Sequence, residues 1–287
     1  MKNEIKGGIL YVVATPIGNL QDITLRALEA FKKAQIIFAE DTRVTRKLLE
    51  QYCIKPPIII SCHEYNEQAR VDLLVQHLDD QKITLLVSDA GTPLISDPGF
   101  HIVKTLRNKG YQVVPLPGVS ALIAGLSAAG VATDHFQFQG FLSSKSGVRK
   151  KILQSIEQNT MTTVFFESKH RIISTLQDID SILPKHTLVV AKELTKQFEG
   201  FFSGYAHEVL RIFEKDTSLT KGEFVILIEG IKEEKITETI VDENKLLILL
   251  LAELPIKNAV NIAVKLTKGK KNALYKKALI IQESYTN

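Results

Sequence analysis

Short apolar runs alternate with amphipathic segments along the first part of the chain. Runs rich in Ile, Val and Leu predict strands, and segments with an apolar residue at every third or fourth position predict helices. The predicted strands lie at Ile9–Ala14, Ile36–Ala39, Ile58–Ile60, Ile83–Val87 and Val113–Leu116. Predicted helices, such as Ile23–Lys33 and Gln68–Leu78, separate them. This alternation is typical of an α/β domain with a mostly parallel sheet.

The same pattern begins again after a predicted helix at Gly118–Gly130. The second set of predicted elements comprises strands at Phe136–Phe141, Thr162–Phe166, Thr187–Ala191 and Glu223–Ile228, and helices at Arg149–Glu157 and Ile172–Ile182. Three short helices follow, at Lys245–Glu253, Ile256–Leu266 and Lys271–Gln282. We therefore expect an N-terminal α/β domain over 1–118, a second α/β domain over 119–232, an acidic linker over 233–244 and a small basic helical domain over 245–287.

Composition places the chain among globular proteins. Its 287 residues are 45% hydrophobic and 24% charged, which is enough apolar material for real cores and excludes a disordered chain. The longest apolar run, Leu246–Ala252, is too short to span a membrane, and Met1–Gly8 lacks the apolar region of a secretory signal. Two cysteines agree with a reducing compartment. We expect a cytoplasmic protein without membrane contact.

Positive charge is concentrated at the C-terminal end. Seven lysines and one glutamate between Pro255 and Asn287 give this tail a net charge of +6, so the remainder sums to −2 against the whole chain's +4. Lysines separated by apolar positions predict basic helices that bind nucleic-acid phosphates regardless of the base sequence. A solubilising charged surface is the alternative interpretation.

Four loops follow predicted strands and carry glycine, proline or small polar residues, at Thr15–Leu20, Ala39–Arg43, Ser88–Gly99 and Pro115–Ala121. Ligands of open α/β sheets bind outside the carboxyl ends of the strands, so these loops are where a site is expected. Each also contains residues suited to capping a helix, which is the structural alternative. In Ser88–Gly99, Asp97 and Pro98 fit the start of a helix that runs to Asn108, whereas Asp89 and Gly91 favour binding of an amino-acid group.

Several common sites are missing from the sequence. It contains neither the G-x-G pattern of dinucleotide-binding folds nor a G-x-x-x-x-G-K-[ST] phosphate loop. His63-Glu64 does not continue into the H-E-x-x-H zinc pattern, and there is no G-x-S-x-G nucleophile elbow. Nucleotide hydrolysis and ordinary NAD chemistry are therefore disfavoured, and no metal site is predicted.

Eight segments in order resemble one family. They are ILYVVATPIGNLQDIT (9–24), AEDTRVT (39–45), SDAGTPLISDPG (88–99), PLPGVSA (115–121), GFLSSK (140–145), FESKHR (166–171), KELTKQFE (192–199) and KGEF (221–224). Together they resemble the bacterial 16S ribosomal RNA ribose 2′-O-methyltransferases of the tetrapyrrole (corrin/porphyrin) methylase superfamily. The match runs from about Ile9 to Gly230.

The resemblance implies a two-domain class III methyltransferase fold, a homodimer and the cofactor S-adenosylmethionine (AdoMet). It also implies methylation of a cytidine ribose in the decoding centre (helix 44) of 16S rRNA in the small ribosomal subunit. Carried over by motif, the residues expected to bind AdoMet are Pro16, Asp89, Gly91, Thr92, Ile95, Ser120, Ala121, Phe166, Glu167 and Gly222.

The reaction needs a group that takes the proton of the ribose hydroxyl and cations that hold the RNA backbone. The candidates for proton transfer are Asp41, Lys192 and Glu193, with Glu40 beside Asp41 as a further carboxylate. The candidates for phosphate binding are Arg43, Lys145, Arg171, Lys196, Lys270 and Lys271. For each of these residues, an ordinary salt bridge or a solvated face is the alternative.

Two other functions remain open. A methylase of a tetrapyrrole or another small acceptor would use the same fold, although the basic tail argues against it. A non-catalytic RNA-binding factor that keeps AdoMet as a structural ligand would bind RNA without turnover.

Overall fold

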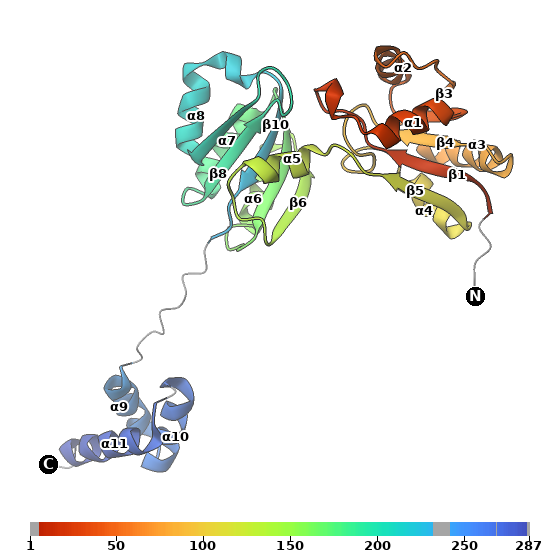
Figure 1. The fold of residues 1–287 in the computed structure, drawn as a ribbon. Coiled ribbons are helices and arrows are strands. Elements are labelled where there is room, and N and C mark those ends of the chain that lie inside the picture. Colours follow the sequence, from red (N-terminus) through yellow and green to blue (C-terminus); the bar gives the residue numbers. More distant parts are fainter. Residues whose placement is uncertain (1–5, 232–241, 268, 286–287) are drawn as a thin grey trace. The chain divides into compact units, whose positions relative to one another are not determined.

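The computed structural model describes residues 6–231, 242–267 and 269–285. The chain divides into two compact units, 1–231 and 232–287, which are described separately here (Figure 1). Residues 233–241 of the predicted acidic linker and Lys268 of the basic tail lie outside the described residues. Among the described helices, none has the length and apolar character that a membrane span requires.

The first sheet is fully parallel, with the strand order β3-β2-β4-β1-β5. Its strands are β1 (Lys6–Val13), β2 (Ile36–Ala39), β3 (Ile58–Ser61), β4 (Thr84–Val87) and β5 (Tyr111–Leu116). The helices of this half are α1 (Leu25–Lys33), α2 (Thr42–Gln51), α3 (Glu67–Asp79) and α4 (Phe100–Asn108), with a 3-10 turn at Leu20–Asp22. The predicted parallel α/β architecture is confirmed.

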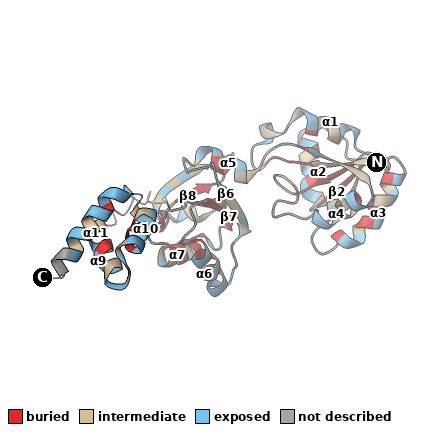
Figure 2. Ribbon diagram, turned by 90° about the horizontal axis from the view of Figure 1, so that it is seen from below, coloured by how far each residue is buried: buried red, intermediate tan, exposed pale blue. Residues whose placement is uncertain are grey.

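Helices cover both faces of this sheet, which explains why its strands are continuously apolar. In β2, Ile36 and Phe38 pack with α3 and α4, whereas Ile37 and Ala39 face α1 and α2. All four side chains are buried, and full burial of one such as Phe38 contributes about 1.5–3 kcal/mol. In Figure 2 the buried residues accordingly lie along the strands and on the inner faces of the helices.

The second sheet is mixed, in the order β6-β7-β10-β8-β9, with only β6 and β7 parallel among its pairs. Its strands are β6 (Phe136–Phe141), β7 (Thr162–Ser168), β8 (Thr187–Lys192), β9 (Gly200–Tyr205) and β10 (Glu223–Ile228). The helices are α5 (Ala121–Ala128), α6 (Ser146–Ser155), α7 (Ile172–Ile182) and α8 (Ala206–Lys215), with a 3-10 turn at Thr217–Thr220.

Strand β9 and helix α8 are not among the elements that the sequence predicts. Strand β9 lies at the sheet edge, where Phe201, Ser203 and Tyr205 are exposed, and it begins with Gly200. An edge strand of this kind lacks the continuous apolar run of a buried strand. Helices α6, α7 and α8 cover one face of the sheet, and α5 packs on the other.

The second unit contains three helices, α9 (Glu243–Glu253), α10 (Ile256–Thr267) and α11 (Lys271–Tyr285), as the sequence predicts. Leu247, Val260 and Leu274, one from each helix, are fully buried in its core. Asp242 caps α9 by accepting hydrogen bonds from the amides of the first turn, so this helix begins two residues before the predicted start of the helical domain.

Candidate active site

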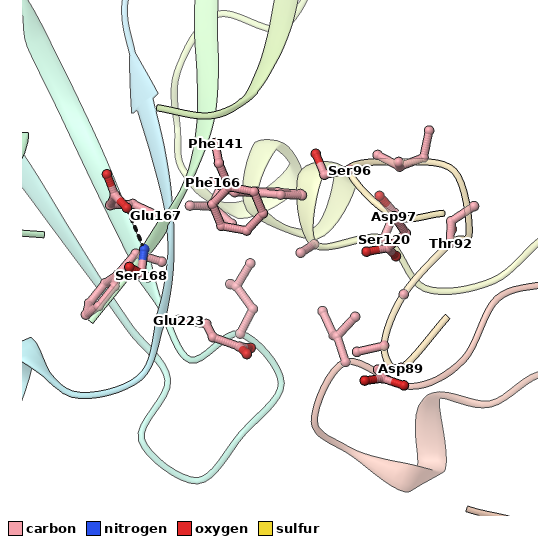
Figure 3. A pocket seen from close by; sticks show the side chains of 18 of the residues that line it. Asp89, Thr92, Ser96, Asp97, Ser120, Phe141, Phe166, Glu167, Ser168 and Glu223 are labelled. Atoms are coloured by element: carbon pink, nitrogen blue, oxygen red, sulfur yellow. Dashed lines mark hydrogen bonds between the residues drawn. The ribbon is translucent and has the colours of Figure 1, made fainter. Parts of the chain in front are cut away.

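A cavity of about 360 Å³ lies between loops of the first sheet and loops of the second, and its size is typical of a small-molecule site. Figure 3 shows side chains from the two halves facing one another across it. The lining residues are Ile17, Glu40, Asp89, Ala90, Gly91, Thr92, Ile95, Ser96, Asp97, Ser120, Ala121, Phe141, Phe166, Glu167, Ser168, Leu194, Lys196, Glu223, Phe224 and Val225.

The loop between β4 and α4 forms much of the wall on the side of the first sheet. Backbone hydrogen bonds of 2.9 Å run in both directions between Thr15 and Gly91, so the loop is fastened to the end of β1. The hydroxyl of Thr92 donates to the carbonyl of Val119 at 3.0 Å, which ties the same loop to the β5–α5 connection. Three loops predicted from the sequence are therefore joined at one edge of the sheet.

The prediction that Asp97 caps helix α4 is wrong. The helix begins at Phe100 with Gly99 as its N-cap, and Asp97 lies two residues earlier, in the cavity wall. Burial, together with the nearby carboxylates of Glu40 and Asp89, raises the pKa of Asp97 to about 6, although a hydrogen bond from the Ser88 hydroxyl partly offsets the effect.

Glu40 and Asp89 line the cavity beside Asp97 and are linked in a chain. The Asp89 amide donates to Glu40 at 3.2 Å, and the Asp41 amide donates to Asp89 at 2.9 Å. Burial raises the pKa of both lining carboxyls. Each carboxylate is thus fixed by a backbone amide of its neighbour.

Asp41, a predicted proton acceptor, does not line the cavity. It caps α2 by accepting the Arg43 amide, and the Arg43 guanidinium lies 2.5 Å from its other carboxylate oxygen. Hydrogen bonds from Arg43 hold the pKa of Asp41 well below its usual range. The structural alternative considered for Asp41, a helix cap, is present.

Strand β7 ends in the cavity with Phe166, Glu167 and Ser168. Glu167 is buried and accepts hydrogen bonds from the Ser168 amide at 2.7 Å, from Arg171 Nε at 2.9 Å and from the Thr175 hydroxyl at 2.7 Å. The guanidinium of Arg171, a predicted phosphate ligand, is therefore paired with an internal carboxylate. The Phe166 ring packs at an angle against Phe141, with 5.6 Å between centroids.

The loop after β8 contributes Leu194 and Lys196 to the cavity. Lys196 Nζ lies 2.9 Å from both Glu193 Oε1 and Glu223 Oε2, and Glu193 also accepts the Glu223 amide at 3.0 Å. Burial opposes ionisation of Glu193, but the hydrogen bonds from Lys196 and Glu223 outweigh it and lower its pKa. Lys196 likewise has a raised pKa despite burial, because two carboxylates accept from it.

Lys192 is the third predicted proton-transfer residue. It ends β8, is buried, and donates from Nζ to the Phe198 carbonyl at 3.4 Å. The cavity wall does not include it.

Of the residues predicted to bind AdoMet, eight line the cavity and Pro16 and Gly222 are next to lining residues. Of the predicted phosphate ligands, Lys196 is in the wall, whereas Lys145 is exposed at the start of α6 and Lys270 and Lys271 are exposed in the second unit. Glu40, the further carboxylate considered for proton transfer, also lines the cavity. The lining residues that the sequence did not indicate are Ile17, Ala90, Ser96, Asp97, Phe141, Ser168, Leu194, Glu223, Phe224 and Val225. Several of these residues are next to a predicted site residue in the sequence, so their position beside the motifs is the signal that could have identified them.

Two family models match the chain. Residues 9–210 match the Tetrapyrrole (Corrin/Porphyrin) Methylases, and residues 238–282 match the RsmI C-terminal HTH domain. The first match runs from β1 to α8, so it includes every strand of the two sheets except β10, and the second covers most of the three-helix unit.

Curated relatives are similar over nearly their whole length. The Ribosomal RNA small subunit methyltransferase I of Haemophilus influenzae is 46% identical over 93% of this chain and 95% of its own length. The protein of the same name from Escherichia coli O157:H7 is 45% identical over 95% of each chain.

Solved structures share the fold at much lower identity. A diphthine synthase superposes with a TM-score of 0.62 at 14% identity, covering 78% of this chain and 90% of that one. A uroporphyrin-III C-methyl transferase from Thermus thermophilus, complexed with S-adenyl homocysteine, gives 0.52 at 19% identity over 77% and 97%.

Proposed function

Because the chain belongs to the tetrapyrrole (corrin/porphyrin) methylase family, it is an AdoMet-dependent methyltransferase, and we propose that its acceptor is ribosomal RNA of the small subunit. The observation that most supports this acceptor is the similarity to rRNA methyltransferases across both units, the basic helical unit included. The proposed product is a 2′-O-methylated cytidine in helix 44, the decoding centre of 16S rRNA. Such an enzyme acts in the cytoplasm, and the family resemblance favours a homodimer.

The cavity has the chemistry that AdoMet requires. Phe141 and Phe166 offer an aromatic surface suited to an adenine ring. On the opposite side, the carboxylates of Glu40 and Asp89 line the cavity, which favours the positively charged sulfonium and ammonium groups. Figure 3 shows Asp89 on this side. An aromatic surface and a pair of carboxylates therefore face each other across the cavity, which suits the two ends of AdoMet.

Bound AdoMet supplies a methyl group that is already activated on a sulfonium sulfur. The chain must then orient the ribose hydroxyl in line with the methyl group, exclude water and provide a destination for the hydroxyl proton. The fastened 88–99 loop gives a rigid wall on one side of the cavity. The Glu193, Lys196 and Glu223 cluster fixes the wall on the other side.

The residues that the sequence suggests for proton transfer and for RNA contact have surroundings that suit these roles to different degrees. Asp41 and Glu193 are each paired with a cation and have lowered pKa values, which makes them weak proton acceptors. Lys145 is exposed and suited to phosphate. Arg43 is also exposed, although its guanidinium is paired with Asp41. Arg171 and Lys196 are already paired, and we propose that they position the cavity wall.

The test is transfer of labelled methyl from AdoMet to purified small ribosomal subunits and, in parallel, to free 16S rRNA. We expect label in an alkali-resistant 2′-O-methylcytidine of the decoding centre. AdoMet binding without any labelled RNA would contradict the proposed acceptor. Labelling of a porphyrinoid under the same conditions would favour a small-acceptor methylase instead.

A further inference from the structure

The segment between β4 and α4 carries Asp97 into the cavity through an unusual backbone path. Leu94 and Ser96 both adopt left-handed conformations, with φ of 74° and 66°, and Gly99 has a φ of 130°. Non-glycine residues in this region cost about 1–2 kcal/mol each, and such strain is concentrated at functional sites. The turn separates Asp97 from the helix start that its sequence position suggests.

Asp97 differs from the other carboxylates of the cavity wall in its partners. Glu40 and Asp89 each accept a backbone amide, Glu167 accepts three donors, and Glu223 is paired with Lys196. Within the described part of the chain, neither an amide nor a cation hydrogen-bonds Asp97. The Ser88 hydroxyl, which lowers the pKa of Asp97, also lies 3.3 Å from the Ala90 carbonyl as a donor. The Asp97 carboxylate therefore retains acceptor capacity towards a group in the cavity.

Of the residues that the sequence suggests for proton transfer, Glu40 lines the cavity but already accepts the Asp89 amide, and the other three do not share this property either. Asp41 is held by Arg43, and Glu193 is held by Lys196 and the Glu223 amide. Lys192 lies outside the cavity wall. A general base has to reach the proton it abstracts, directly or through one water, which favours a group in the wall itself.

We propose that the carboxylate of Asp97 is the general base that receives the ribose hydroxyl proton during methyl transfer. This inference rests on the proposed function. The ribose oxygen forms a bond to the methyl carbon, the bond from that carbon to the sulfonium sulfur breaks, and its electron pair stays on sulfur. The hydroxyl proton moves to Asp97 and is later released to solvent.

The surroundings of Asp97 suit this role at neutral pH. Burial beside Glu40 and Asp89 raises its pKa to about 6, so the group is ionised at pH 7 to 8 and is a stronger base than an ordinary aspartate. Lys196, across the cavity, is neutralised by Glu193 and Glu223. We therefore expect the methyl-transfer rate of the wild-type enzyme to fall as the pH is lowered through about 6.

The experiment measures single-turnover methyl transfer to small ribosomal subunits at saturating AdoMet, from pH 5 to 9, together with the Kd for AdoMet. The variant is Asp97→Asn, which keeps the shape of the side chain. Loss of a general base reduces rates by about 100-fold to 10,000-fold, and we expect a reduction in this range with little change in AdoMet Kd. The acidic limb of the pH profile should also disappear.

Two further variants make the result specific. Asp72→Asn removes one negative charge from the exposed face of α3, and we expect wild-type rates. Asp97→Glu retains a carboxylate and should recover part of the lost rate, with an acidic limb still present. A circular-dichroism melting curve for each variant establishes that it is folded.

The possible outcomes are distinct. Should Asp97→Asn weaken AdoMet binding but keep its rate at saturation, Asp97 is an electrostatic partner of the cofactor and the inference is overturned. An unchanged acidic limb in Asp97→Asn overturns it as well. If the wild-type enzyme itself labels no small subunit, the proposed function fails, and the inference about its base fails with it.

Discussion

The carboxylate of Glu193 lies directly against the backbone of Gly222, so a β carbon at position 222 would be 2.6 Å from Glu193 Oε1. Gly222 also has a φ of +110°, which side chains rarely adopt. The same carboxylate holds Lys196 and the Glu223 amide. A single glycine thus allows the cluster that forms one wall of the cavity.

The Gly222→Ala variant is expected to lose AdoMet affinity and about 2–4 kcal/mol of stability, because the backbone strain and the collision with Glu193 add together. Isothermal titration calorimetry and thermal unfolding measure the two effects. Gly110→Ala is the matched control, since Gly110 has a φ of +84° and nothing within 4 Å of an added β carbon. It should show the backbone cost of about 1–2 kcal/mol and normal AdoMet binding. Equal losses in both variants would contradict the role of the Glu193 contact.

The Glu167 and Arg171 pair should be a source of stability. The side chain of Glu167 is 0% exposed and that of Arg171 is 28% exposed, so Arg171→Ala leaves a buried carboxylate without its cation. We expect a loss of about 2–4 kcal/mol, somewhat below the usual cost for a fully buried pair. Chemical denaturation measures it.

A second substitution tests the cause of that loss. Glu167→Gln in the Arg171→Ala background removes the unpaired charge, so the double variant should be destabilised by less than the sum of the two single variants. Arg211→Ala, on the exposed face of α8, should change stability by no more than about 0.5 kcal/mol. Strict additivity of the two single effects would argue against a direct interaction.

Asp97 is expected to make the protein less stable at neutral pH. Burial raises its pKa from the ordinary value of 3.8 to about 6 in the folded protein, so the folded state favours the neutral form. The preference of the folded state for the neutral carboxyl contributes to the free energy of unfolding. This stabilisation is fully present below pH 3.8 and is lost as the pH rises through about 6. Asp97→Asn should therefore unfold at a higher temperature than the wild type at pH 7.5. Because solvent screens this partly exposed carboxylate, we expect an added stability of about 1–2 kcal/mol.

The difference in melting temperature between these two proteins should shrink as the pH is lowered towards 4. Differential scanning calorimetry over this range measures it directly. A difference that stays constant with pH would show that the substitution acts through packing rather than through the charge.

The basic helical unit is expected to bind RNA mainly through phosphate. Lys270 and Lys271 are exposed at the start of α11, so replacing both with glutamine should weaken binding to small subunits and reduce its salt dependence. Each lost phosphate contact lowers the slope of log K against log salt by about 0.7–0.9. Lys32→Gln/Lys33→Gln on α1 removes the same charge from the first unit and should leave the slope unchanged. Binding-filter assays at several salt concentrations compare the two double variants.

Much of the architecture could be predicted from the sequence because burial on both faces leaves a local pattern. Strands such as β2 and β4 are continuously apolar, and the helices around them are amphipathic. Strand β9 was missed for the converse reason, since an edge strand with alternating exposure has no such run. The loops at Thr15–Leu20 and Ser88–Gly99 were identifiable because each follows a buried strand and combines glycine with small polar residues.

The amino-acid sequence by itself determined the two α/β halves, the three C-terminal helices, and the motifs that indicate an AdoMet-dependent methyltransferase. Only the tertiary structure decided which charged residues face the cavity. Asp97 has the local chemistry of a helix cap, but a left-handed turn at Leu94 and Ser96 delays the helix and leaves its carboxylate in the cavity wall. Arg171 and Lys196 look like free cations, yet residues brought close by the fold neutralise them. Local patterns specify elements because backbone periodicity is local, whereas the charge state of a side chain depends on neighbours that only the folded chain supplies.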